Sequence, residues 1–157
     1  MNKTVSQETL EHRILHGLSC EWETALWVLD EPHRRRMRPP LFCLRDYRRT
    51  WGTWSRERRE ISLSRDLVLR HSWDAVTEVL LHEMAHCLGH MHHGRSFRRD
   101  LLKLVSRFMG RPQANALKNA FKAHKLPCGD ARKPLTFEQW KAARDRMVNA
   151  RKKMLDC

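Results

Sequence analysis

Residues 80–87, Leu-Leu-His-Glu-Met-Ala-His-Cys, constrain the fold of this chain more than any other stretch. They contain the pattern H-E-x-x-H. On an α-helix, residues four positions apart lie on the same face, so His82 and His86 can present two imidazoles to one metal ion. Glu83 follows the first histidine directly, and its carboxylate can take a proton from a water in the metal's open position. The pattern therefore predicts a helix that carries a Zn²⁺ site, with Glu83 as the general base.

The residues around the motif support a buried helix. Its apolar positions are Val76, Val79, Leu80, Leu81 and Leu88. Polar groups buried in such a helix destabilise it unless they are paired or bind a metal. Ser72 is a suitable N-cap and Gly89 a suitable C-terminal stop, so we expect the helix to cover residues 73–88.

Two histidines after this helix compete for the position of the third ligand. Counted from His86, Gly89 and His92 complete the pattern H-E-x-x-H-x-x-G-x-x-H, which is typical of metzincins. Metzincins also have a methionine-containing turn, and here Met109 falls within or just after an apparent helix. The other candidate is the next residue, His93. The spacing alone leaves both histidines open.

The N-terminal half predicts a helix and a small sheet. Apolar residues recur at helical spacing over residues 6–30, and we expect Trp22 and Trp27 to lie in the core. Residues 33–40 contain prolines and several arginines, which predicts a loop. Residues 41–44 and 61–64 have strand patterns, and the segment between them is a strongly basic turn. The expected fold class is α+β, a small zincin-like domain with a short antiparallel sheet.

Further helices are expected after the metal motif. One begins near Phe97 and ends before Gly110, and a shorter one covers residues 113–124. A last, basic helix is expected over residues 137–155, because residues 136–139 have the form of a capping box. We accordingly divide the chain into a catalytic domain, residues 1–125, and a basic helical extension, residues 126–157.

The net charge of +13, from 31 Lys and Arg against 18 Asp and Glu, favours a polyanionic partner. Ten arginines and only two acidic residues lie within residues 34–59. Tryptophans among arginines can stack on the bases of a single strand, although they could equally cover the core of the sheet. We expect nucleic acid, with single-stranded DNA favoured, to contact Arg34, Arg35, Arg36, Trp51, Trp54, Arg56, Arg58 and Arg59.

The five cysteines form no C-x-x-C pair, which indicates free thiols in a reducing compartment. Residues 1–11 contain no apolar signal segment, and no stretch of the chain is long enough to span a membrane. We expect a cytoplasmic protein that is not secreted, with association with a nucleoid or a nuclear location as alternatives. No membrane partner is expected, and the oligomeric state stays open.

The order of these motifs resembles the Spartan-related, SprT-like zinc metallopeptidase domain over about residues 6–108. The matching pieces are Gly52-Thr53-Trp54, Ile61-Ser62-Leu63-Ser64, residues 80–86 and His93-Gly94-Arg95-Ser96-Phe97. The resemblance implies that His82, His86 and His93 bind zinc and that Glu83 is the general base. Only residues 87–92 separate the second and third of these histidines, fewer than in Spartan-type members. The four-cysteine ribbon of many relatives is absent, because only Cys128 and Cys157 lie downstream.

The resemblance implies a zinc-dependent endopeptidase that cleaves proteins, including proteins crosslinked to DNA. Three alternatives remain from the residues themselves. One is a zinc hydrolase with a nucleic-acid or small-molecule substrate. Another is a non-enzymatic basic module that binds nucleic acid and holds a structural zinc. The third is a metzincin-like protease that uses His92. Tyr47 and His92 are candidate groups to stabilise an oxyanion.

Overall fold

The structure is a computed structural model, and it describes residues 5–27 and 29–128. Its elements in chain order are α1 (Val5–Leu26), α2 (Glu31–Arg36), β1 (Leu41–Arg45), β2 (Gly52–Ser55), β3 (Glu60–Ser64), α3 (Arg65–Arg70), α4 (Trp73–Cys87), α5 (Arg95–Phe108) and α6 (Arg111–Ala123). The α+β class, the N-terminal helix, the motif helix and two helices after it are confirmed. The expected basic helix at 137–155 lies outside the described residues.

The sheet has three strands in the order β1-β3-β2. Strand β2 pairs with β3 in antiparallel fashion, whereas β1 pairs with β3 in parallel, with Leu41 opposite Glu60. The prediction of a wholly antiparallel sheet is therefore wrong. The segment predicted as a turn contains strand β2. Strand β2 pairs with one edge of β3, and β1 pairs with the other edge of β3. Strand β2 is consequently an edge strand with one unpaired side.

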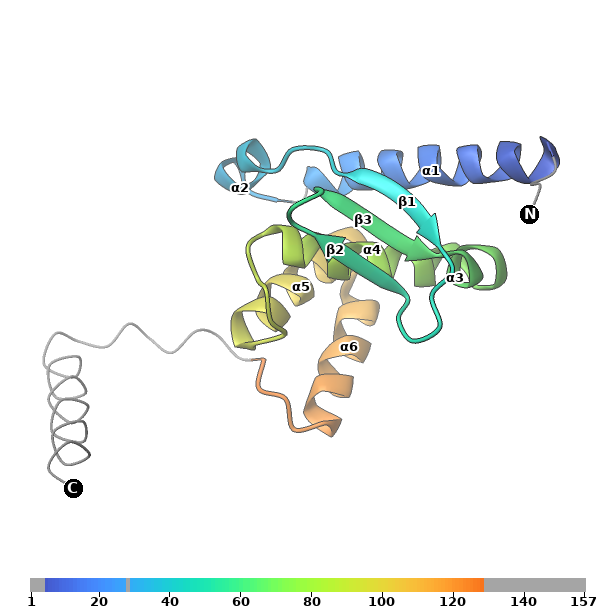
Figure 1. The fold of residues 1–157 in the computed structure, drawn as a ribbon. Helices are drawn as coiled ribbons and strands as arrows, with labels where there is room; N and C mark the ends of the chain where they lie inside the picture. The colour runs from blue at the N-terminus through green and yellow to red at the C-terminus, as the bar shows by residue number, and fades with distance from the viewer. Residues whose placement is uncertain (1–4, 28, 129–157) are drawn as a thin grey trace, which may run out of the picture.

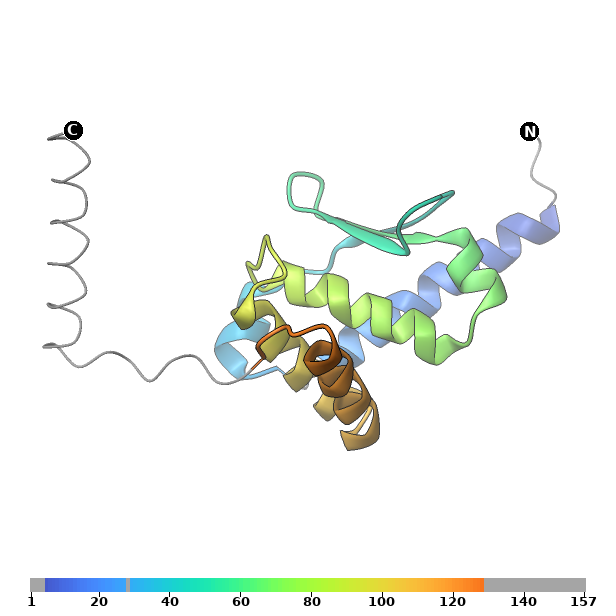
Figure 2. The ribbon, with the colours of Figure 1, turned by 90° about the horizontal axis from the view of Figure 1, so that it is seen from below.

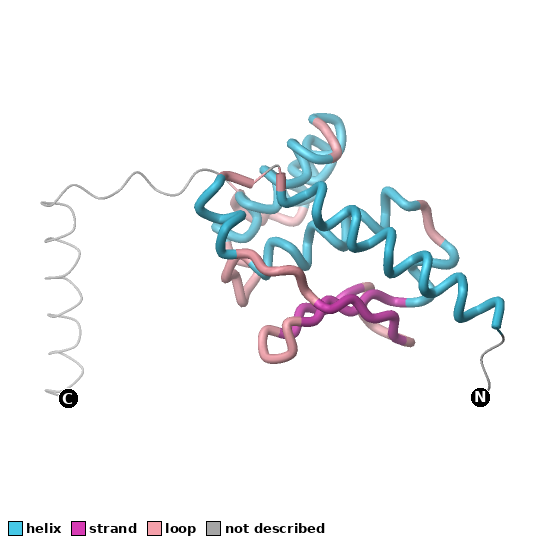
Figure 3. Tube along the Cα trace, turned by 90° about the horizontal axis from the view of Figure 1, so that it is seen from above, coloured by secondary structure: helices cyan, strands magenta, loops and turns pink. Residues whose placement is uncertain are grey.

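Helices cover one face of the sheet (Figure 3), and α1, α3 and α4 contact its strands. The core contains buried residues of α1, β1, β3 and helices α3 to α6, and Figure 1 shows where these elements lie. Its largest fully buried side chains include Trp22 of α1, Ile61 and Leu63 of β3, and Leu81 and Met84 of α4. Leu81 and Met84 are buried in the core and fix the position of α4. The motif residues of this helix are therefore held next to β2.

The N-terminal region differs from the prediction in two places. Trp22 is buried and packs edge-on against Phe42, as expected, but Trp27 is 75% exposed. Helix α1 ends at Leu26, and the guanidinium of Arg34 lies 4.6 Å from the Trp27 ring centroid. Part of the expected loop is helical, because Asp30 caps α2 by accepting a hydrogen bond from the backbone N–H of His33.

Helix α4 begins as predicted. The Ser72 side chain accepts a hydrogen bond from the backbone N–H of Ala75, which confirms it as the N-cap. Leu88 is the C-cap, and Gly89 follows in the left-handed region with φ of 102°, a conformation that glycine adopts readily. This turn frees the chain to double back over the end of α4. Within the described residues, no helix is long and apolar enough to cross a membrane.

Candidate active site

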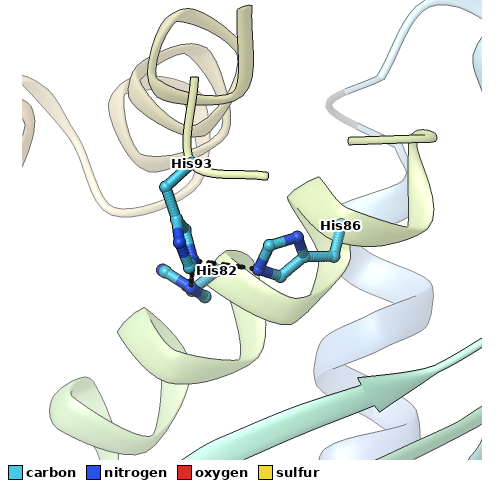
Figure 4. A group of neighbouring side chains, drawn as sticks. All are labelled: His82, His86 and His93. Atoms are coloured by element: carbon cyan, nitrogen blue, oxygen red, sulfur yellow. Dashed lines mark hydrogen bonds between the residues drawn. The ribbon is translucent and has the colours of Figure 1, made fainter. Parts of the chain in front are cut away.

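Three imidazoles converge on one point beside α4 (Figure 4). His82 and His86 lie on adjacent turns of the helix, and His93 reaches them from the loop before α5. The Nε2 atom of His93 is 2.9 Å from Nε2 of His82 and 3.1 Å from Nε2 of His86. Among the residues that the structure describes, these are the three that could hold a metal ion together.

Phe97 is the packing partner of all three rings. It lies in the first turn of α5 and is buried, and its ring centroid is 4.6–4.9 Å from those of His82, His86 and His93. Burial lowers the pKa of His82 to about 4, with further lowering by the neighbouring His86 and His93. Burial likewise lowers the pKa of His93. The rings of His82 and His93 therefore favour the neutral form, which is the form that binds metals.

Glu83 lies on the sheet side of α4, where only 4% of its surface is exposed. Burial raises the pKa of its carboxyl group to about 7, because the charged form loses hydration. A carboxyl group with a pKa in this range can both accept and return a proton near neutral pH. This placement suits a general base better than a structural ion pair.

Two residues of α5 clamp the loop that carries His93, and sequence reasoning missed both. The carboxylate of Asp100 is 2.8 Å from Nε2 of His90, and the backbone carbonyl of His90 lies 2.6 Å from Nδ1 of His86. The guanidinium of Arg98, 8% exposed, donates to the backbone carbonyl of His93. Asp100 therefore orients His86 through His90, and Arg98 orients His93 through its backbone.

Arg98 also donates to the backbone carbonyl of Pro127 at 2.9 Å. No carboxylate pairs with this buried cation among the described residues, so carbonyl oxygens are its partners there. The one sequence signal is its position, one residue after Phe97. Six of the 14 residues of α5 are charged, so the sequence alone does not distinguish Arg98 from the cations of this helix that face solvent.

The cluster opens into a pocket of about 590 Å³. Edge strand β2 forms one wall with Gly52, Thr53 and Trp54. Apolar side chains from three helices form the rest, namely Val79, Leu101, Val105 and Leu117. Neither Tyr47 nor His92 lines this pocket: the Tyr47 hydroxyl is hydrogen-bonded to Thr53 at 2.8 Å, and His92 is exposed.

The residues predicted to contact nucleic acid come from α2, from β2 and the residue before it, and from the turn between β2 and β3. Trp51 is 48% exposed and stacks edge-on with His71 at the start of β2, while Trp54 is half-buried against the core. Arg35 pairs with Glu31 along α2. The three arginines that do come together are Arg36, Arg56 and Arg59, which line a second groove of about 580 Å³.

The fold and the three-histidine cluster together define an α+β protein with a candidate metal site. The model of the SprT-like family matches residues 19–115, more than half of the chain, and the chain belongs to this family. No significant match was found among curated proteins. Among solved structures the chain is similar to the crystal structure of the metallopeptidase zymogen of Pyrococcus abyssi abylysin, at 20% identity and a TM-score of 0.44. That match covers 68% of this chain and 98% of that chain.

Proposed function

We propose that this protein is a zinc-dependent endopeptidase that hydrolyses polypeptides, with His82, His86 and His93 as metal ligands. The observation that carries the proposal is the convergence of three Nε2 atoms next to a buried carboxyl group, at the mouth of an open pocket. A structural zinc site would instead be closed by a fourth protein ligand.

The donor set fits zinc. Nitrogen ligands of tetrahedral zinc, at about 2.0–2.1 Å from the ion, lie roughly 3.3 Å from one another. The Nε2 of His93 is 2.9 Å and 3.1 Å from those of the two helix histidines, close to that spacing. Neutral imidazoles that converge in this way would repel through their lone pairs, and a cation between them removes the repulsion. His86 is further fixed because its Nδ1 donates to the His90 carbonyl, which leaves Nε2 free to bind.

When bound, zinc supplies a Lewis acid that polarises a carbonyl group and acidifies water. Glu83 accepts the proton of the attacking water and then delivers it to the amine that leaves. Its burial keeps other water away, so the proton is retained between these two steps. Phe97 and the α5 clamp hold the imidazoles in place throughout.

The free edge of β2 indicates how a polypeptide would bind. An extended chain can add to an unpaired strand edge through backbone hydrogen bonds, which tolerate many side chains. Strand β2 lines the pocket, so a chain that adds to it passes over the three histidines. Its side chains would alternate between the apolar wall and solvent. This geometry supports protein substrates over small molecules.

The test compares wild type with Glu83→Gln in the digestion of casein and of histone, each protein loaded with zinc. Glu83→Gln removes the base and keeps the three nitrogens, so we expect full zinc content and at least about a hundredfold loss of hydrolysis. Asp74→Asn, on the exposed first turn of the same helix, is the matched control. A variant that keeps zinc and cleaves as fast as wild type would remove Glu83 from the mechanism. A wild type that binds zinc and cleaves neither protein would favour a binding module.

We further propose that the substrates are proteins held close to nucleic acid, with single-stranded DNA favoured. The net charge of +13 supports this, as do exposed cations away from the catalytic pocket, among them Lys118 and Lys122 of α6. Fluorescence anisotropy of a labelled oligonucleotide at two salt concentrations tests it. Binding should weaken steeply with salt because neutralised phosphates release counterions. Absent or salt-independent binding would remove nucleic acid as a partner.

A further inference from the structure

A second groove continues from the catalytic pocket along the line of β2. The two hollows share Trp54, His86 and Met91. Strand β2 starts at the catalytic pocket and ends at Ser55, directly before the turn at residues 56–59 that forms a wall of the groove. A polypeptide that extends along β2 therefore leaves the three histidines at one end and enters this groove.

The groove is strongly basic. Arg36 comes from the last turn of α2, and Arg56 and Arg59 come from the turn between β2 and β3, so two separate elements contribute. Within residues 5–27 and 29–128, none of these three arginines forms an ion pair with a carboxylate. Neighbouring arginines, by contrast, are paired: Arg35 with Glu31 and Arg45 with Glu60. The groove thus keeps three cations available to a ligand.

The backbone at Arg59 adds an independent observation. Its φ is 50°, in the left-handed region that favours glycine, and its carbonyl accepts a hydrogen bond from Leu41 at 2.8 Å. A residue with a bulky side chain in this region is unusual and concentrates at functional sites. The turn could close with glycine at lower strain, but glycine would remove one of the three cations from the groove.

We propose that this groove binds acidic side chains of the polypeptide substrate, so that Arg36, Arg56 and Arg59 determine a preference for Asp and Glu near the scissile bond. The inference rests on the proposed peptidase function. Guanidinium groups bind carboxylates through paired, charge-assisted hydrogen bonds. A strand advances about 3.3 Å per residue, so the preference should fall within about four residues of the bond. A phosphodiester chain in this position would block the substrate path past His86, which favours a polypeptide over nucleic acid as its occupant.

The experiment is a digest of a proteome-derived peptide library by the zinc-loaded full chain, with cleaved bonds identified by mass spectrometry. We expect Asp and Glu to be enriched on one side of the cleaved bond. In digests by the variants Arg56→Glu and Arg36→Glu, Lys and Arg should be enriched at those peptide positions instead. Arg48→Glu, an exposed loop arginine outside both hollows, makes the same change in net charge and should keep the wild-type preference.

Matched peptides from that digest then give rates. For a peptide with Asp at the preferred position against its Asn counterpart, we expect about a tenfold higher kcat/KM in wild type, mainly through KM. Arg56→Glu should lose this ratio, whereas Arg48→Glu should keep it and cleave the Asn peptide within about twofold of wild type.

The outcomes are distinguishable. Cleavage of many peptides without acidic enrichment would overturn the inference and leave the peptidase function standing. No cleavage of any peptide would instead count against the peptidase function itself. Single-stranded DNA that competes with peptide in wild type, together with loss of DNA binding in Arg56→Glu, would assign the groove to nucleic acid and overturn the proposal.

Discussion

Gly52 lies directly against the carboxyl group of Glu83. A β-carbon built on Gly52 would be 3.1 Å from Oε1 of Glu83 and 2.8 Å from Cγ1 of Val79. The edge strand and the motif helix approach so closely because this position has no side chain. The wall of the pocket and the position of the general base are therefore set by the same contact (Figure 2 shows β2 beside α4).

We expect Gly52→Ala to lower the free energy of unfolding by about 1–3 kcal/mol, because an added methyl group must displace Val79 or the Glu83 carboxylate. Urea denaturation followed by circular dichroism measures this. Gly94→Ala is the matched control, since nothing lies within 4 Å of a β-carbon at that position. Equal stability of Gly52→Ala and wild type would mean that the strand can retreat freely from the helix.

Replacement of His93 distinguishes the two registers of the third ligand. His93→Ala should lose stoichiometric zinc, because its Nε2 lies at the point where the other two imidazoles meet. His92→Ala should retain zinc, because its exposed side chain belongs to no such cluster among the described residues. Zinc content of the two purified variants decides between them, and the reverse result would establish the metzincin-like register.

Arg98 and Asp100 should tune zinc affinity without touching the ion. We expect Arg98→Met and Asp100→Asn each to weaken zinc binding by about 10–100-fold, as loss of groups that orient ligands does elsewhere. Competition with a chromogenic chelator measures the affinity. Arg98→Lys should recover part of the loss because it restores a donor to the His93 carbonyl.

A purely structural role for the clamp predicts a different pattern. In that case the variants would melt at lower temperature without zinc and bind zinc normally once folded. Arg95→Ala, on the exposed start of the same helix, should change neither property.

Glu60 should confer stability that depends on pH. Hydrogen bonds from Ser62 and Arg45 lower the pKa of its carboxyl group from 4.5 to about 2. Because the folded-state pKa is depressed, the stabilisation is complete above about pH 4.5 and is lost as pH falls toward 2. Glu60→Gln should therefore be about 1 kcal/mol less stable than wild type at pH 7, with a difference that shrinks through this window. A constant difference from pH 7 to pH 2 would contradict the assignment.

The motif helix could be predicted because its signals are local. Ser72, the apolar positions of α4 and Gly89 all act within a few residues of where they lie. The parallel pairing of β1 with β3 could not be predicted, because it depends on where β2 inserts, and the short β2 has a weak strand pattern among arginines. Trp27 was expected in the core from its hydrophobicity, yet α1 ends before it and its ring meets Arg34 instead.

In the site, too, the features with local sequence signals could be predicted, and those that depend on tertiary packing could not. His82, Glu83 and His86 are fixed by helical spacing, and the approach of His93 agrees with the family pattern. The clamp by Arg98 and Asp100 depends on the angle between α4 and α5, which no spacing encodes. The grouping of Arg36 with Arg56 and Arg59 is likewise tertiary, because α2 and the β2–β3 turn are distant in the chain.

The pairing of the sheet also has a consequence for the order of folding. Strands β2 and β3 join residues across a turn of only four positions, from Ser55 to Glu60, whereas Leu41 of β1 must find Glu60 across 19 positions. Because the shorter loop closes with less loss of chain entropy, the β2–β3 hairpin should already be formed in the transition state. Substitutions in the hairpin should then slow folding, and substitutions in β1 should mainly accelerate unfolding. The basic turn would exist before the chain has a core to hold it.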